Sequence, residues 1–299
     1  MTGVSISEVA PRDGLQSIGA FVPTETKIAM VRALHAAGLR RMEVGSFVSP
    51  KHVPQMADTA AVLAAAKTLP GLECCVLVPN RRGFDLALQH GAHRLGLFMS
   101  ATEQHNLANL NMTREASFDA LTAIIRDTPR DVAIRFNLSC VFHCPFEGVV
   151  PEAAIQPLVE RIVAIDPRME IALCDTTGNA APDQVARVMR AAIVVGGPRF
   201  AYHGHDTYGM GVANVAAAYE AGVRVIDSAA GGLGGCPFAP GATGNVATED
   251  VAWMFARMGV ATGIDYPALL VAADYCAGVP GGTPGGRMRG VPAARRLAA

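Results

Sequence analysis

Residues 200–228 read FAYHGHDTYGMGVANVAAAYEAGVRVIDS. The run at 200–203 is short and apolar, and residues 209–221 repeat apolar side chains at helical spacing before Gly222. A second apolar run, 223–228, follows that glycine. Short apolar runs predict buried strands, and glycine is favoured where a helix ends. The stretch therefore predicts a strand, a helix and a second strand.

The same alternation extends through most of the chain. Apolar runs predict eight strands, at Val4–Ala10, Arg41–Gly45, Glu73–Pro79, Arg94–Met99, Val132–Ser139, Glu170–Cys174, Phe200–His203 and Val223–Ser228. Helical spacing predicts eight helices, at Glu25–Ala37, Asp58–Lys67, Arg81–Gln89, Arg114–Asp127, Pro151–Ile165, Pro182–Ile193, Gly209–Ala221 and Val246–Met258. Eight strands, each followed by a helix, are typical of a (β/α)8 barrel. The first strand lacks a following G-x-G-x-x-G pattern, which argues against an open dinucleotide-binding sheet.

We therefore predict the α/β class, and a (β/α)8 TIM barrel with a C-terminal helical extension and a flexible tail. Residues 1–280 form a single catalytic domain in this prediction. Residues 281–299 form the tail, because they are rich in Gly, Pro and Arg. A length of 299 residues suits one large barrel domain.

The composition excludes several classes of protein. The chain is 51% hydrophobic and 17% charged, with a net charge of −1. It can bury a large core, and it has no excess charge to attract nucleic acid or an anionic membrane. The apolar runs are far shorter than the roughly 18 residues of a membrane span, and the N-terminus has no targeting pattern. Seven cysteines, an odd number, favour a reducing compartment, so we expect a cytoplasmic protein.

Charged residues follow the first two predicted strands, where a barrel carries its chemistry. Arg12 and Asp13 stand side by side before Gly14. They are either a surface ion pair before a turn or part of a site. Glu43 ends the second strand and would point into an apolar barrel mouth, where an unpaired carboxylate is costly. Glu43 is therefore a functional acid, a buried partner of Arg12, or both.

A pair of histidines ends the seventh predicted strand. His203 and His205 project to the same side, because alternate residues of a strand do so. An H-x-H pair at the end of a barrel strand predicts a metal site, with Asp13 as the natural carboxylate ligand and Asp206 as a residue that orients a histidine. With Asp and Asn oxygens completing the set, Mg²⁺ or Mn²⁺ is favoured.

A glycine-rich loop, residues 230–245, follows the eighth strand and contains Cys236. We interpret it as a mobile flap that carries a reactive thiol, because a loop that only cradles phosphate would not need the cysteine. Asn245 stands at the end of the loop, before the last predicted helix, and can reach back to a metal. Asp175 ends the sixth strand at the same rim, and Asn109 lies in the loop after the fourth strand, where it can contact substrate.

Five motifs together resemble the hydroxymethylglutaryl-CoA lyase family. They are PRDGLQ (11–16), SFVSPK (46–51), VPQMAD (53–58), HGHDT (203–207) and GLGGCPFA (232–239). The resemblance runs from about Val4 to Gly263. Related condensing synthases carry Glu where this chain has Leu15, and they lack the cysteine loop.

The resemblance implies a role for each matching residue. Four residues would ligate a divalent cation, Mg²⁺ or Mn²⁺: Asp13, His203, His205 and Asn245. Arg12 would stabilise an enolate oxygen, and Cys236 would act as an acid or base. Glu43 and Asp175 would position these groups, and His203 is also a candidate for proton transfer. Substrate contacts are expected from Arg12, Gln16, Ser46 and Asn109.

The activity that the resemblance implies is retro-Claisen cleavage of 3-hydroxy-3-methylglutaryl-CoA to acetyl-CoA and acetoacetate. Substitutions at Ser17–Gly19, Cys174 and His105–Asn106 depart from the family near the expected acyl and CoA positions. The alternative is therefore the same cleavage of another tertiary 3-hydroxyacyl-CoA, such as citramalyl-CoA or a longer-chain analogue. An acyl-CoA condensing synthase or a barrel that only binds acyl-CoA fits the residues less well. We also expect a homo-oligomer, a dimer or a tetramer.

Overall fold

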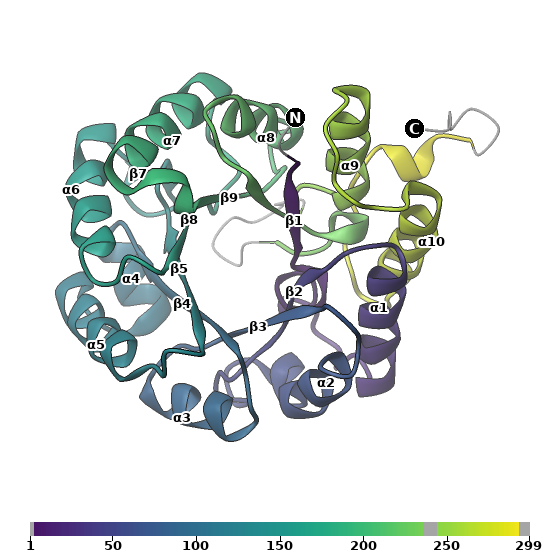
Figure 1. Cartoon of the computed structure of the whole chain (residues 1–299), viewed down its shortest axis with the longest axis horizontal. Helices are drawn as coiled ribbons and strands as arrows, with labels where there is room; N and C mark the ends of the chain where they lie inside the picture. Colours follow the sequence, from purple (N-terminus) through teal and green to yellow (C-terminus); the bar gives the residue numbers. More distant parts are fainter. Residues whose placement is uncertain (1–2, 236–243, 293–299) are drawn as a thin grey trace.

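The computed structural model describes residues 3–235 and 244–292, and eight parallel strands close into a barrel around its centre (Figure 1). Neighbours around the barrel follow the order β1, β10, β9, β8, β5, β4, β3, β2. Their bounds are β1 Ser5–Glu8, β2 Arg41–Ser46, β3 Glu73–Leu77, β4 Arg94–Ser100, β5 Ala133–Ser139, β8 Glu170–Asp175, β9 Phe200–Gly204 and β10 Val225–Ser228. The predicted barrel is confirmed.

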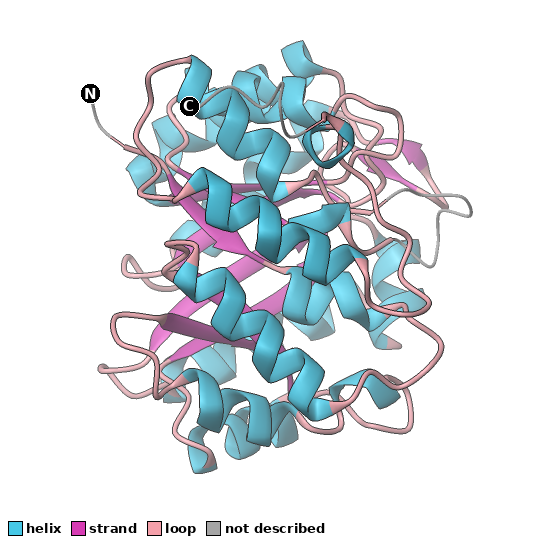
Figure 2. Cartoon of the chain, turned by 90° about the vertical axis from the view of Figure 1, so that its right-hand side faces the viewer, coloured by secondary structure: helices cyan, strands magenta, loops and turns pink. Residues whose placement is uncertain are grey.

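Helices flank the barrel on the outside (Figure 2). They are α1 Thr24–Ala36, α2 Thr59–Ala66, α3 Arg81–Gln89, α4 Glu103–Leu110, α5 Arg114–Asp127, α6 Glu152–Val163, α7 Pro182–Gly196, α8 Gly211–Glu220, α9 Thr248–Arg257 and α10 Tyr266–Ala277. The last of these, the expected C-terminal helix, lies against α1 and α9. Within the described ranges, no helix is both long enough and apolar enough to cross a membrane.

The structure corrects the sequence prediction at three places. Strand β1 ends at Glu8, and the chain then forms a wide helical turn, Ala10–Gly14, that was expected to begin as strand. The Val9 carbonyl accepts hydrogen bonds from Arg12, Asp13 and Gly14 in this turn. The segment after β4 is helix α4 rather than a loop. A small hairpin, β6 (His143–Cys144) with β7 (Gly148–Val149), follows β5.

An ionic layer fills the amino-terminal end of the barrel, where apolar side chains are more usual. Its members are Arg41, Glu73, Arg94, Arg135, Glu170 and Asp227. Glu170 lies within 2.9 Å of guanidinium nitrogens from three strands, β2, β4 and β5. Burial alone would raise the pKa of Glu170, but the three arginines lower it to about 2. The carboxylate is therefore ionised at neutral pH.

A second buried carboxylate, Glu8, joins the two ends of the chain. Its Oε1 accepts hydrogen bonds from the amides of Ala10 (2.8 Å) and Ala230 (3.0 Å), and its Oε2 accepts one from Thr248 Oγ1 (2.8 Å). The neighbouring Glu249 accepts the Gly231 amide at 3.1 Å. Burial raises the pKa of each of these two carboxyl groups to about 7.

The beginning of the expected tail makes specific contacts with the barrel. The backbone amides of Arg287 and Met288 donate to the Asp250 carboxylate at 2.8 to 3.0 Å. The Gly285 amide donates to the Gly231 carbonyl at 2.8 Å. Residues 281–292 thus contact Gly231 at the start of the cysteine loop and Asp250 after its end, while the domain division at residue 280 stays a prediction.

Candidate metal centre and active site

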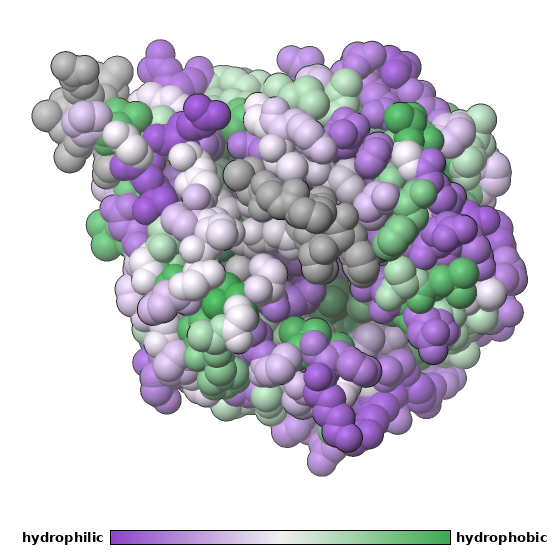
Figure 3. Space-filling view, turned by 180° about the vertical axis from the view of Figure 1, so that it is seen from behind, coloured by the Kyte–Doolittle hydropathy of each residue, from purple (hydrophilic) through white to green (hydrophobic). Residues whose placement is uncertain are grey.

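The carboxyl ends of the barrel strands surround a cavity of about 820 Å³. Figure 3 shows a hollow near the centre of the face that is turned away in Figure 1, with hydrophilic and hydrophobic residues on its walls. Eight of the predicted site residues line the cavity: Arg12, Asp13, Gln16, Glu43, Ser46, Asn109, His203 and His205. The cavity continues inward to the ionic layer, since the arginines and acids of that layer also line it.

Asp13, His203 and His205 form a cluster whose possible ligand atoms all lie within 4.8 Å of one another. Two elements bring them together. The helical turn after β1 presents Asp13, while the end of β9 presents the two histidines. Their imidazole centroids are 5.2 Å apart, and His205 Nε2 lies 3.7 Å from Asp13 Oδ2.

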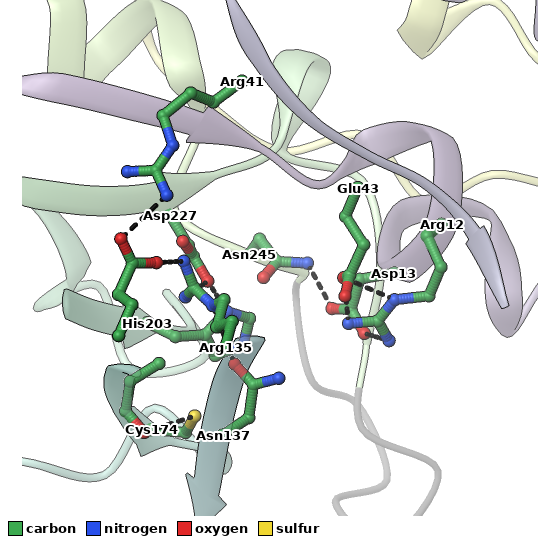
Figure 4. Close-up of polar contacts among 12 residues, drawn as sticks. Arg12, Asp13, Arg41, Glu43, Arg135, Asn137, Cys174, His203, Asp227 and Asn245 are labelled. Atoms are coloured by element: carbon green, nitrogen blue, oxygen red, sulfur yellow. Dashed lines mark hydrogen bonds and ion pairs between the residues drawn. The ribbon is translucent and has the colours of Figure 1, made fainter. Parts of the chain in front are cut away.

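Asn245, which follows Cys236 in the sequence, lies beside this cluster and faces Asp13 (Figure 4). Its amide nitrogen donates to Asp13 Oδ2 at 2.7 Å and to the Leu233 carbonyl at 3.1 Å. Its buried Oδ1 and the buried Nδ1 of His205 have no hydrogen-bond partner in the described part of the chain. Buried polar atoms without partners are uncommon, and imidazole and oxygen donors suit a divalent cation. These residues fit such an ion.

Arg12 connects the Asp13, His203 and His205 cluster to β2. Its Nε donates to Glu43 Oε2 at 2.6 Å, and its Nη1 donates to Asp13 Oδ1 at 2.6 Å and to Gln16 Oε1 at 3.3 Å. Burial would lower the pKa of Arg12, but the carboxylates of Glu43 and Asp13 raise it above its ordinary value. Burial would raise the pKa of Asp13, but the Arg12 guanidinium together with His205 and His203 holds the pKa of that carboxyl well below its usual range. Both groups are charged at the cavity wall.

The other predicted residues occupy distinct positions. Ser46 lines the cavity and donates to the Leu77 carbonyl at 3.2 Å. Asn109 lines it from α4. Asp175 is fully buried, and its oxygens accept the backbone amides of Asn179 and Ala180 at 3.1 Å. Its carboxylate thus holds the turn after β8. Cys236 lies outside the described residues, although Gly235, the residue before it, lines the cavity.

Asp227 and Arg135 were not predicted from the sequence. Asp227 Oδ2 lies 3.1 Å from His203 Nδ1 and 2.6 Å from an Arg135 nitrogen. Asp206 accepts the Gly211 amide at 2.7 Å before α8, and its role beside a histidine stays a prediction. Asp227 interrupts an apolar strand in the same way as Glu43, and this signal could have identified it. Arg135 interrupts the apolar strand β5 in the same way, although the sequence pattern does not indicate which distant residues it contacts.

The strands form a closed barrel, and a cavity at their carboxyl ends contains the Asp13, His203 and His205 cluster. These features define a TIM-barrel protein with a candidate site for a divalent metal. The model of the HMGL-like family matches residues 3–275, and the chain belongs to this family.

Sequence relatives cover most of the chain. It is 40% identical to the mitochondrial hydroxymethylglutaryl-CoA lyase of Rattus norvegicus, over 91% of this chain and 84% of that protein. It is 39% identical to the hydroxymethylglutaryl-CoA lyase of Pseudomonas mevalonii, over 90% of each. A mitochondrial relative from Arabidopsis thaliana is 41% identical over 91% of this chain, which spans 58% of that longer protein.

A solved structure of an HMG-CoA lyase from Acinetobacter baumannii, in complex with coenzyme A and 3-methylmalate, superimposes with a TM-score of 0.92. It is 37% identical and the match covers 99% of this chain and 97% of that one. The carboxyl transferase domain of Rhizobium etli pyruvate carboxylase, at 18% identity and a TM-score of 0.71, shares the fold alone.

Proposed function

We propose that the protein is a divalent-metal-dependent carbon–carbon lyase that cleaves 3-hydroxy-3-methylglutaryl-CoA to acetyl-CoA and acetoacetate. The observation that carries the proposal is the meeting of Arg12 with the Asp13, His203 and His205 cluster in one cavity. The relatives support the proposal as well, because the chain is about 40% identical to hydroxymethylglutaryl-CoA lyases over nine-tenths of its length.

Asp13, His203, His205 and Asn245 would hold the cation, Mg²⁺ or Mn²⁺. When bound, the ion would orient the tertiary hydroxyl of the substrate and lower its pKa. The donor set supports a hard ion, because a carboxylate and an amide oxygen accompany the two imidazoles. His203 and Asp13 also line the cavity, so they would face the hydroxyl that loses its proton.

Arg12 would stabilise the charge that forms as the carbon–carbon bond breaks. The bond's electrons pass to the thioester carbon unit and produce an enolate, while the other fragment becomes a ketone. A guanidinium aimed at the enolate oxygen acts mainly in the transition state, where stabilisation accelerates the reaction. Glu43 and Asp13 hold the guanidinium from two sides, so it needs little reorganisation during the reaction.

Cys236 would complete the reaction as the acid that protonates the enolate carbon, giving acetyl-CoA. The position of Gly235 at the cavity wall supports this role. Asp175 would act indirectly, because its carboxylate holds the turn after β8, and the Asp175 carbonyl accepts the His205 amide at 3.3 Å.

An acyl-CoA thioester is the substrate class that the cavity supports. A volume of about 820 Å³ exceeds the need of a six-carbon acyl group and leaves room for part of a thioester arm. Gln16, Ser46 and Asn109 would contact the substrate from the wall. A homo-oligomer in the cytoplasm is part of the same proposal, and the free state of the six described cysteines supports a reducing compartment.

A substrate panel tests the proposal. Purified protein with Mg²⁺ or Mn²⁺ should release acetoacetate and acetyl-CoA from 3-hydroxy-3-methylglutaryl-CoA, as detected by mass spectrometry, and a chelator should abolish the release. Citramalyl-CoA and a longer-chain tertiary 3-hydroxyacyl-CoA complete the panel. Faster cleavage of one of these would reassign the substrate, and metal-independent cleavage would contradict the mechanism.

A further inference from the structure

His203 differs from His205 in having a carboxylate partner on its second ring nitrogen. His203 Nδ1 lies 3.1 Å from Asp227 Oδ2, and the two residues come from the neighbouring strands β9 and β10. An ionised carboxylate only accepts hydrogen bonds, so Nδ1 must carry the proton. The lone pair of the neutral ring is then on Nε2. Figure 4 shows the Asp227 and His203 side chains directed toward one another.

Asp227 is itself held by Arg135, which reaches it from the other side of the barrel. Arg135 lies on β5, and strands β8 and β9 separate it from β10 in the barrel order. Its Nη2 lies 2.6 Å from Asp227 Oδ2, and its Nη1 lies 2.9 Å from Glu170 Oε1. Asp227 and Arg135 are both at most 5% exposed in their side chains. A buried carboxylate of this kind is stable as an anion only when a cation accompanies it.

The third guanidinium nitrogen of Arg135 also has a partner. Its Nε donates to Asn137 Oδ1 at 2.9 Å, and Asn137 in turn donates to the Leu97 carbonyl at 3.2 Å. The guanidinium is thus fixed in its plane and in its position by three side chains. Asp227 Oδ2 contacts both Arg135 Nη2 and His203 Nδ1. The orientation of the His203 imidazole therefore depends on the ionic layer.

We propose that Asp227 and Arg135 are positioning residues that fix the tautomer and the orientation of His203, and thereby set the affinity of the site for its divalent cation. The proposal rests on the proposed function, because it takes His203 as a metal ligand. Partners of this kind on metal-binding histidines typically change metal affinity by about 10-fold to 100-fold when they are removed.

The first test is Mn²⁺ binding to Asp227→Asn, measured by isothermal titration of the metal-free protein. We expect Kd to rise by about 10-fold to 100-fold, with the circular dichroism spectrum unchanged. The matched control is Glu73→Gln, which removes a carboxylate from the same ionic layer without touching His203 or Asp227. It should bind Mn²⁺ like the wild type. Wild-type affinity in Asp227→Asn, or an equal loss in Glu73→Gln, would overturn the proposal.

The second test uses the wild-type protein, so it does not depend on whether a variant at Asp227 folds. Nitrogen NMR of the metal-free wild type at alkaline pH, assigned with His203→Gln, should show the His203 proton on Nδ1. A proton on Nε2 would overturn the proposal. These experiments also distinguish an error in the positioning proposal from an error in the proposed function. If His203→Ala keeps wild-type Mn²⁺ affinity, the metal assignment itself is wrong; if only Asp227→Asn keeps it, the positioning role alone is wrong.

Discussion

Arg12 is held at the cavity wall by two carboxylates, with Nε on Glu43 and Nη1 on Asp13. Arg12→Lys keeps the charge but loses the planar guanidinium, which contacts both carboxylates and, in the proposed mechanism, would also contact the enolate oxygen. We expect kcat to fall by about 10² to 10³ with a smaller change in KM, because the contact forms mainly in the transition state. Steady-state kinetics of the wild type and the variant measure kcat and KM. Arg190→Lys, at an exposed position on α7, is the control and should match the wild type. A kcat within twofold of the wild type would contradict the role.

Cys236 is the second residue on which the proposed mechanism depends, and it lies outside the described residues. Cys236→Ser replaces a thiol by a hydroxyl, which is a far weaker acid. We expect turnover to fall sharply while Mn²⁺ affinity stays the same, since the thiol is not among the ligands. Turnover close to that of the wild type would remove Cys236 from the mechanism.

Much of the site was predictable because reactive residue types stand at strand ends. Asp13, His203 and His205 meet as expected, and Glu43 is the buried partner of Arg12. Asp227 and Arg135 were missed for a physical reason. Each interrupts an apolar strand, but their contact joins β10 and β5 across the barrel, and neither local spacing nor composition reveals which residues pair over that distance.

At the scale of elements, Glu8 and Glu249 join the segments that precede and follow the cysteine loop. Burial raises the pKa of both to about 7, from 4.5. In the folded state they therefore keep protons that the unfolded chain releases above about pH 4.5. Their contribution to stability is full below pH 4.5 and is lost as the pH rises through about 7.

Glu8→Gln tests this pH dependence. Glutamine can still accept the amides of Ala10 and Ala230, and it cannot ionise. We expect the variant to lose less thermal stability than the wild type between pH 5 and 8, as measured by the unfolding temperature across that range. Asp183→Asn, an exposed acid at the start of α7, is the control and should follow the wild type. An unchanged slope in Glu8→Gln would contradict the assignment.

The elements themselves were predictable wherever the apolar pattern is long. Helices α3 and α5 begin and end as predicted. Helix α4 was missed, because its eight residues, EQHNLANL, contain few apolar side chains and resemble a loop in composition. The turn at Ala10–Gly14 was missed because three amides share one carbonyl there, a pattern that has no periodic signal.

At the scale of the whole molecule, a bound cation should stabilise the fold. Asp13 and Asn245 come from opposite ends of the chain, so an ion held by both joins those ends. Ligands that bind only the folded state stabilise it by about 2.7 kcal/mol at 100 times Kd. Mn²⁺ should raise the unfolding temperature of the wild type and have little effect on His205→Ala. Differential scanning calorimetry measures both, and an equal rise in the variant would contradict His205 as a ligand.

The ionic layer also bears on whether this barrel can be assembled from fragments. Glu170 on β8 neutralises Arg41 on β2, which lies 129 positions earlier in the sequence, and Arg94 on β4. A polypeptide that ended after β4 would contain both arginines without this carboxylate. Glu73 would still meet both arginines in the first half, and Arg135 would still meet Glu170 and Asp227 in the second. The contacts of Glu170 with Arg41 and Arg94 would be lost, so two halves of a gene cut at the midpoint should each be less stable than the intact barrel.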